Sequence, residues 1–292
     1  SVQATAKSIL SLMLVLLGFG VAGAIIGYTV GFVVAAVLGT TVLILLLRKH
    51  ARTEDKSSFA GELKILMSYG IPIYIASLLA GFFLSYQNLI LAMFTSDSEI
   101  GNFKAAANFI TLISVLALPI TTALLPAFSK LDSTTKEKTR AFFKTANKYT
   151  ALLILPTAVV IITLSEQIVQ VVYGATYSSA HLYLAIYCLL YFQVGIGYLN
   201  LTSLFNGLGE TRVTLKITLA NVTTFVLLAP LLTSLYRVPG SILAFLISNS
   251  IGVLYGYYIA RTRFEIELAT RSLIKIYLVA LASSLPALLL LQ

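Results

Sequence analysis

The chain has 292 residues, of which 58% are hydrophobic and only 11% are charged. A water-soluble domain normally carries about 25% charged residues to cover its surface, so this composition excludes an ordinary soluble protein. The net charge of +9 would favour nucleic-acid binding in a soluble protein, but in a membrane protein it is typical of Lys and Arg in cytoplasmic loops. We therefore expect the lipid bilayer, and no nucleic acid, as a partner.

The first apolar stretch is long enough for two membrane spans. Residues 8–47 contain no Lys, Arg, Asp, Glu or His, and one helix needs only about 20 apolar residues to cross a bilayer. Glycines around Gly18 and Gly20 indicate a reversal of the chain. Gly23, Gly27 and Gly31 then recur every fourth residue, a spacing that lets helices approach closely in lipid. This glycine face fits tight packing within the chain or a dimer contact.

Hydropathy and turn residues predict an all-α membrane protein, a polytopic bundle of about nine transmembrane helices. The nine expected spans are residues 2–19, 22–47, 64–94, 100–128, 142–164, 179–206, 213–235, 238–260 and 272–291. The odd number of spans, and an opening without a signal-peptide pattern, indicate a piece of a longer polytopic protein.

Basic residues lie in alternate loops of this scheme. All of the 20 Lys and Arg residues except Lys104 and Arg237 fall on one side. Such an imbalance predicts that the basic loops are cytoplasmic and that the protein is a multi-pass protein of the cell membrane.

Polar residues recur at helical spacing inside several expected spans. In the third span Ser85 and Asn88 share a face, with Gln87 adjacent; the seventh carries Thr218 and Asn221. Polar groups in hydrocarbon need a partner or water, so these faces should point into the bundle. They fit either hydrogen bonds between helices or the wall of a hydrated cavity, and as a set they favour the cavity.

Lys104 and Asn108 are the corresponding pair in the fourth span, followed by Thr111. Lys104 could extend to the outer headgroups, or it could face the cavity and attract an anionic substrate such as a phosphate. Arg237, beside a short turn, is interpreted as a surface charge.

The sixth span carries a stripe of tyrosines, among them Tyr187 and Tyr191. Aromatic faces stack on sugar rings, but a tyrosine stripe is also typical of bundle packing or an interfacial belt. No pattern of an enzyme, a metal site or a cofactor site accompanies it, so we expect no catalytic residue, no metal and no cofactor.

Six local motifs lie along the chain at characteristic positions. They are Val-Ala-Gly-Ala-Ile-Ile-Gly at 21–27, Tyr-Gly-Ile-Pro at 69–72, Ile-Gly-Asn-Phe-Lys-Ala-Ala-Ala at 100–107, Leu-Leu-Pro-Ala-Phe-Ser-Lys at 124–130, Val-Tyr-Gly-Ala-Thr-Tyr at 172–177 and Asn-Gly-Leu-Gly-Glu-Thr-Arg at 206–212. In this order and spacing they resemble the motifs of the polysaccharide-unit flippases (O-antigen type, Wzx-like). This family shares a superfamily with the multidrug and toxin extrusion transporters and the lipid II flippases.

The resemblance implies two six-helix lobes and extra C-terminal helices, with a substrate path between the lobes. It assigns residues 1–50 to the last two helices of an N-terminal lobe, 51–263 to the C-terminal lobe and 264–292 to an additional helix. The family often has an acidic residue near the position of Gln87 and Asn88, so coupling to an ion through a carboxylate there is in doubt.

The leading hypothesis is a flippase that exports a lipid-linked oligosaccharide for cell-surface glycan synthesis by alternating access. The expected substrate-translocation residues are Asn88, Lys104, Asn108, Asn221, Tyr187 and Tyr191, and the missing N-terminal lobe is an expected partner. The alternatives are a multidrug or organic-cation antiporter of the same fold and a non-transport membrane scaffold or glycan polymerase. The oligomeric state stays open.

Overall fold

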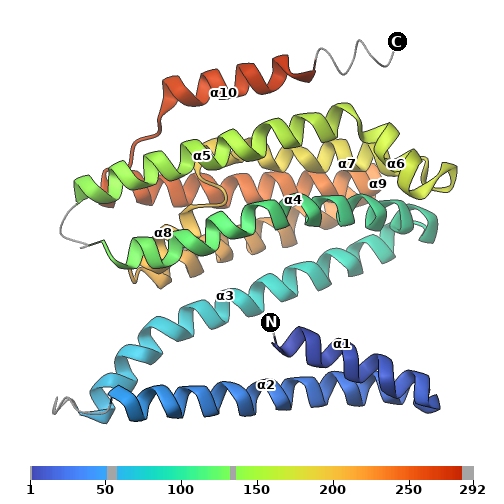
Figure 1. The fold of residues 1–292 in the computed structure, drawn as a ribbon. Helices are drawn as coiled ribbons and strands as arrows, with labels where there is room; N and C mark the ends of the chain where they lie inside the picture. The colour runs from blue at the N-terminus through green and yellow to red at the C-terminus, as the bar shows by residue number, and fades with distance from the viewer. Residues whose placement is uncertain (1, 51–57, 132–135, 285–292) are drawn as a thin grey trace. The chain divides into compact units, whose positions relative to one another are not determined.

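The computed structural model describes residues 2–50, 58–131 and 136–284. Every regular element in these ranges is a helix, which confirms the all-α prediction (Figure 1). In chain order the helices are α1 (Val2–Leu14), the π-helical η1 (Val15–Phe19), α2 (Gly20–His50), α3 (Phe59–Phe94), α4 (Asp97–Ser129), α5 (Lys136–Thr163), α6 (Ser165–Tyr173), η2 (Ala175–Tyr177), α7 (Ala180–Cys188), η3 (Leu189–Ile196), α8 (Leu201–Gly207), α9 (Thr211–Phe264) and α10 (Thr270–Ala282).

Among the described residues, five helical segments are long and apolar enough to cross a membrane, and a bent pair formed by 180–196 and 201–207 would be a sixth. Two of the five contain a chain reversal, so each accounts for two of the expected spans. The segment Lys7–Val42 turns at Gly18, whose φ is 91°. The 54-residue α9 turns at Arg237, whose φ is 55°. Part of the ninth expected span, from 285 onward, lies outside the described residues.

The chain forms two compact units, residues 1–61 and 62–292. In the first unit, α2 returns along α1, and the Ser11 hydroxyl donates a hydrogen bond to the Ala24 carbonyl at 3.2 Å. A Cβ at Gly27 would lie 2.5 Å from the Cα of Ser11, so glycine is required there. The glycine face therefore packs inside the chain, as one of its two readings predicted. The assignment of this unit to an N-terminal lobe remains a prediction.

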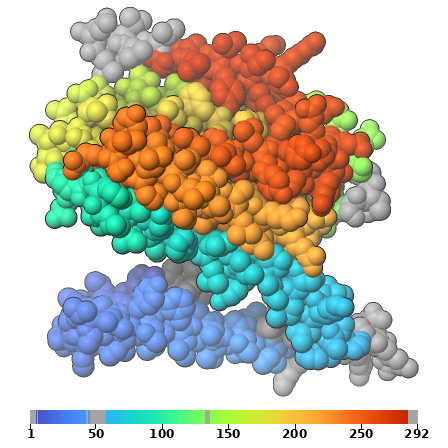
Figure 2. Space-filling view, turned by 180° about the vertical axis from the view of Figure 1, so that it is seen from behind, coloured from blue at the N-terminus to red at the C-terminus, as the bar shows by residue number. Residues whose placement is uncertain are grey.

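The core of the second unit lies where α4, α5, α7 and η3 meet the second limb of α9. Ile113, Ile154 and Leu184 are almost fully buried there. The remaining helix, α10, runs beside α5 (Figure 1), and the Tyr277 hydroxyl on α10 donates to the Phe192 carbonyl of η3. From the opposite side, α9 is bordered by α3 and α4 (Figure 2).

The sixth expected span is not a continuous helix. Its α-helical start in α7 tightens into the 3₁₀-helix η3, and Gly197 then takes a left-handed conformation with φ 110°. The helical segments 180–196 and 201–207, on either side of this residue, meet at an angle of 45°. A left-handed residue ends a helix, and glycine adopts it without a Cβ penalty. The prediction of one regular helix over 179–206 is therefore wrong in this respect.

A buried polar network stabilises this break. The Asn147 amide donates to the Gly195 carbonyl at 2.7 Å, and the Asn200 amide donates to Asn147 Oδ1 and Thr150 Oγ1, both at 3.1 Å. Asn147, Thr150 and Asn200 are buried. Because the 3₁₀-helix and the break free backbone carbonyls in a membrane-spanning region, such internal partners are needed.

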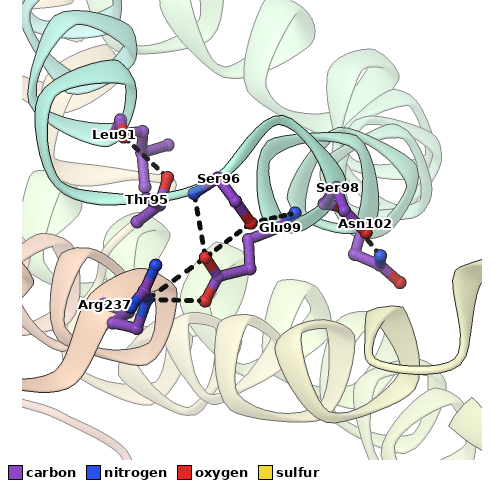
Figure 3. A network of polar contacts seen from close by, with 7 residues as sticks. All are labelled: Leu91, Thr95, Ser96, Ser98, Glu99, Asn102 and Arg237. Atoms are coloured by element: carbon purple, nitrogen blue, oxygen red, sulfur yellow. Dashed lines mark hydrogen bonds and ion pairs between the residues drawn. The ribbon is translucent and has the colours of Figure 1, made fainter.

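The turn between α3 and α4 is joined to the turn inside α9 (Figure 3). Ser96 caps α4 in a reciprocal capping box with Glu99, and the Glu99 carboxylate also accepts from Arg237 Nε at 2.9 Å. An acidic residue in the first turn favours the helix dipole. Arg237 is therefore a surface charge, as interpreted from the sequence, with 58% of its side chain exposed, and its ion pair in addition connects two loops.

The opposite end of the second unit is tied by ion pairs between α5 and the loop after α9. Lys136 Nζ lies 2.9 Å from Glu265 Oε1, and Arg140 pairs with Glu267. The hydrogen bond and charge of Lys136 hold the pKa of Glu265 below its usual value. Both pairs are exposed, so their contribution to stability is small.

Candidate functional site

Two hollows in the second unit bring together most of the expected site residues. The Lys104 hollow, of about 310 Å³, is lined by α3, α4 and α7. The Asn221 hollow, also of about 310 Å³, is lined by α3 and both limbs of α9. Leu84 on α3 lines both. The two hollows are therefore neighbours on either side of one helix.

Helical periodicity explains which side chains of α4 reach the first hollow. Lys104, Ala107, Thr111 and Ser114 line it, and residues three, four and seven apart share one helix face. From α3, Gln87 and Asn88 complete the polar part of the wall. Of the stripes predicted from the sequence on these two helices, Asn88, Lys104 and Thr111 therefore line a common space, whereas Ser85 and Asn108 are not among the lining residues.

Lys104 and Asn88 are in direct contact. The Lys104 ammonium donates a hydrogen bond to Asn88 Oδ1 and lies 5.9 Å from the centre of the Phe103 ring. Lys104 lines the hollow, as the second of its two sequence-based alternatives expects, and its attraction of an anionic substrate stays a prediction. No carboxylate lines the Lys104 hollow among the described residues, so this space carries a net positive charge.

Gln87 has a different role from its neighbour. Its side chain is 3% exposed, and its amide donates to Ser241 Oγ on the second limb of α9 at 3.4 Å. Gln87 therefore holds α3 against α9, while Asn88, one residue later, is exposed to the hollow.

The two candidate tyrosines differ in what they contact. Tyr187 lines the Lys104 hollow. The centre of its ring lies 6.0 Å from that of Phe103 and 5.0 Å from that of Phe245. Tyr191 is 1% exposed, and its hydroxyl donates to the Ile110 carbonyl at 2.9 Å. Tyr191 is thus a core residue whose polar group already has a partner, and the geometry favours packing over substrate contact for it.

The Asn221 hollow contains a residue that the sequence analysis missed. The Asn221 amide donates to Asn249 Oδ1 at 3.1 Å, and the Asn249 amide donates to the Phe245 carbonyl at 2.8 Å. Asn221 Oδ1 is buried and accepts no hydrogen bond from the described residues. The signal for Asn249 was its place between Ser248 and Ser250 in an otherwise apolar span.

Asn108 lies apart from both hollows. Its amide donates to the Tyr173 hydroxyl of α6 at 3.2 Å, and it is absent from either lining. A step of four residues advances about 40° around a helix beyond a full turn, which is enough to direct Asn108 towards α6 instead. The expected grouping of Asn108 with Lys104 is wrong in this structure.

Solved structures with a similar fold are membrane transporters. The lipid II flippase MurJ in an inward closed conformation matches with a TM-score of 0.69 and 19% identity over 98% of this chain and 60% of that chain. A MATE protein in the straight conformation matches with a TM-score of 0.71 and 17% identity, over 90% of this chain and 61% of that chain. A variant of the Vibrio cholerae MATE transporter VcmN matches with a TM-score of 0.66 and 17% identity, over 90% of this chain and 62% of that chain.

These likenesses concern the fold, and the chain spans about 60% of the length of each of these proteins. A comparison with curated protein sequences finds no match. A family model described as "Polysaccharide biosynthesis protein" matches residues 2–182, more than half of the chain. The chain is therefore a multi-pass membrane protein that belongs to this polysaccharide biosynthesis family.

Proposed function

We propose that the protein containing this chain is a flippase that exports a lipid-linked oligosaccharide for the synthesis of a cell-surface glycan. The observation that carries the proposal is the Lys104 hollow, which combines a cation, an amide and an aromatic ring on three helices. A cation attracts the phosphate of a lipid-linked sugar, amides hydrogen-bond to sugar hydroxyls, and aromatic faces pack against sugar rings.

The position of the hollows along α3 supports a path through the membrane. Lining residues on α3 extend from Ala80 to Asn88, and a separate groove begins at Lys64. Lys64 and Asn88 are 24 residues apart in one helix, which corresponds to about 36 Å. The hydrocarbon core is about 30 Å thick, so hollows on different faces of α3 would together extend from one interface almost to the other.

In this proposal the protein resides in the plasma membrane with its basic loops in the cytoplasm. The lobes would rock around a site that includes Asn221 and Lys104. Residues 1–50 would belong to an N-terminal lobe, 51–263 would form the C-terminal lobe, and the N-terminal lobe would supply the opposite wall. The lipid tail would stay in the bilayer while the polar headgroup crosses.

An antiporter for organic cations is the competing function, because proteins named as MATE transporters share the fold. A cationic substrate needs carboxylates or a neutral aromatic cage. The described residues that line the two hollows include Lys104 and no carboxylate. Electrostatic repulsion by Lys104 therefore disfavours an organic cation.

Gene deletion tests the proposed function. Cells that lack the full-length protein should accumulate lipid-linked oligosaccharide on the cytoplasmic side of the membrane, where a membrane-impermeant glycosidase added from outside cannot reach it. The same strain with the intact gene restored is the control. Normal surface glycan in a deletion strain that also lacks every other gene of this family would refute the proposal. Efflux of cationic dyes that depends on the gene would favour the antiporter.

A further inference from the structure

A groove with a basic rim lies where α3 and the first limb of α9 begin. Its volume is about 580 Å³, within the range of about 300–1,000 Å³ typical of small-molecule sites. Its apolar wall comes from Met67, Ile71, Pro72, Leu215 and Leu219. Its rim carries Lys64, Arg212 and Lys216. We call this feature the basic groove.

The two helices run in the same direction, so the cations gather near one end. The Tyr69 hydroxyl donates to the carbonyl of Asn206 in α8, five residues before α9 begins, and further along α3 the Tyr86 hydroxyl donates to the Val226 carbonyl of α9. Lys64 and Arg212 are therefore at the same end of the pair. Lys216, one turn further, has a flexible stem that can carry its ammonium back to that end.

The dimensions of the groove fit one leaflet of a bilayer. Ile71 and Leu219 follow Lys64 and Arg212 by seven residues in their helices, a rise of about 10 Å. Half of the hydrocarbon core is about 15 Å. When the cations lie at the level of the headgroups, the apolar wall therefore covers the part of that leaflet's hydrocarbon layer that is next to the headgroups.

The rim cations are available to an anion from outside the chain. Lys64, Arg212 and Lys216 are exposed, and within the part of the chain that the structure describes no carboxylate forms an ion pair with them. Glu210, two residues before Arg212, is engaged by Arg263 at 3.5 Å. Three cations beside an apolar wall match a ligand with an anionic head and a hydrocarbon tail.

We propose that the basic groove binds an anionic glycerophospholipid of the leaflet that the basic loops face. The phosphate lies among Lys64, Arg212 and Lys216, and the first part of one acyl chain lies against Met67, Ile71 and Leu219. Basic pockets between transmembrane helices are known to favour anionic headgroups. A zwitterionic lipid would add an ammonium group to a rim that is already cationic, so phosphatidylcholine binds more weakly. The proposal does not depend on which molecule the protein transports.

Native mass spectrometry of the full-length protein in detergent tests this proposal. Palmitoyl-oleoyl phosphatidylglycerol is titrated against phosphatidylcholine with the same acyl chains, and glycerol phosphate serves as the headgroup without a tail. We expect tighter binding of phosphatidylglycerol than of either comparator. A single cation near an anionic lipid changes affinity roughly five-fold, so the double variant R212Q/K216Q should bind phosphatidylglycerol about 25-fold more weakly.

Two matched variants make the result specific. The double variant K138Q/K144Q removes the same charge from exposed positions on α5 and should bind phosphatidylglycerol like the unaltered protein. L219W fills the groove without changing the rim and should weaken phosphatidylglycerol but leave glycerol phosphate unchanged. Equal affinity for the two phospholipids, or an equal loss in both double variants, would overturn the proposal. Tight binding of glycerol phosphate alone would also overturn it, because the tail would then have no part.

Discussion

Replacing Lys104 by Gln is the most direct test of the Lys104 hollow. The substitution removes the charge but keeps a polar side chain, which is one atom shorter than that of lysine. Lys104 is exposed to the hollow rather than enclosed by protein, so the variant should fold normally. Any loss of transport then reports on the substrate.

The expected loss follows from the electrostatics of the hollow. A phosphate about 4 Å from the ammonium interacts with it by about 1 kcal/mol in a water-like medium and about 4 kcal/mol at an effective dielectric constant of about 20. Because the hollow is open on one side, a value of about 1–2 kcal/mol is reasonable. This corresponds to a roughly 5- to 30-fold lower transport rate at limiting substrate.

A double-mutant cycle with Asn88→Ala separates two explanations. If Lys104 acts on the substrate, K104Q should reduce transport by a similar factor with or without Asn88. If Lys104 only positions Asn88 through their hydrogen bond, the two losses should not add. The assay is flipping of a purified lipid-linked oligosaccharide in proteoliposomes that contain the full-length protein. K104R should retain most activity, and unchanged flipping by K104Q would refute a role for the charge.

Three further predictions concern stability. Asn200→Leu removes the buried hydrogen bonds of Asn200 to Asn147 and Thr150 and should lower stability by about 1–3 kcal/mol. The thermal unfolding midpoint should therefore fall further than in Asn221→Leu, which breaks one hydrogen bond, and equal falls would contradict this. Gly27→Leu should abolish a disulfide engineered between α1 and α2, because the Cβ of the new leucine has no room beside Ser11. Gly39→Leu is the control: a Cβ at Gly39 enters open space, so the same disulfide should still form. Arg237→Gln breaks an ion pair whose arginine side chain is 58% exposed and whose glutamate side chain is 25% exposed. The loss of stability should be at most about 1 kcal/mol and should vanish in 1 M salt; a loss that persists in salt would exclude the ion pair as its cause.

The membrane spans could be predicted because each depends on local composition. An apolar run of about 20 residues has few alternatives to a membrane helix, and glycine at 18 and proline at 239 mark two of the reversals. The break at Gly197 could not be predicted in the same way. The sequence around Gly197 stays apolar, so its hydropathy is the same whether the helix is continuous or is broken by a residue with positive φ. What holds the break is a network with Asn147 and Thr150, about 50 residues earlier, which becomes visible only when α5 lies beside η3.

For the candidate site, the sequence predicted which helix face carries the polar residues, but not which of these residues contact one another. Helical spacing placed Asn88 on the polar side of α3 and Lys104 on a polar side of α4, and the structure brings these two together. Asn108 was grouped with Lys104 because the spacing of four residues was treated as one face. The 40° offset mattered because α6 offers Tyr173 as a partner on that side. Asn249 was missed because its significance comes from Asn221 on the other limb of α9.

Hydrogen-bond satisfaction distinguishes the structural polar groups from the functional candidates. Both donors of the Asn200 amide are used inside the protein, and the residue is fully buried, so it serves the fold. Asn221 differs, because its amide is engaged while its Oδ1 accepts no hydrogen bond from the described residues and its side chain borders a hollow. A buried acceptor without a donor costs about 1–3 kcal/mol. Asn221 Oδ1 is enclosed in this structure, so a sugar hydroxyl would recover that free energy only if the Asn221 side chain turned towards the hollow that it lines. Such a turn would make the Asn221 hollow, together with Lys104, a better candidate for a transient substrate contact than the tyrosine stripe.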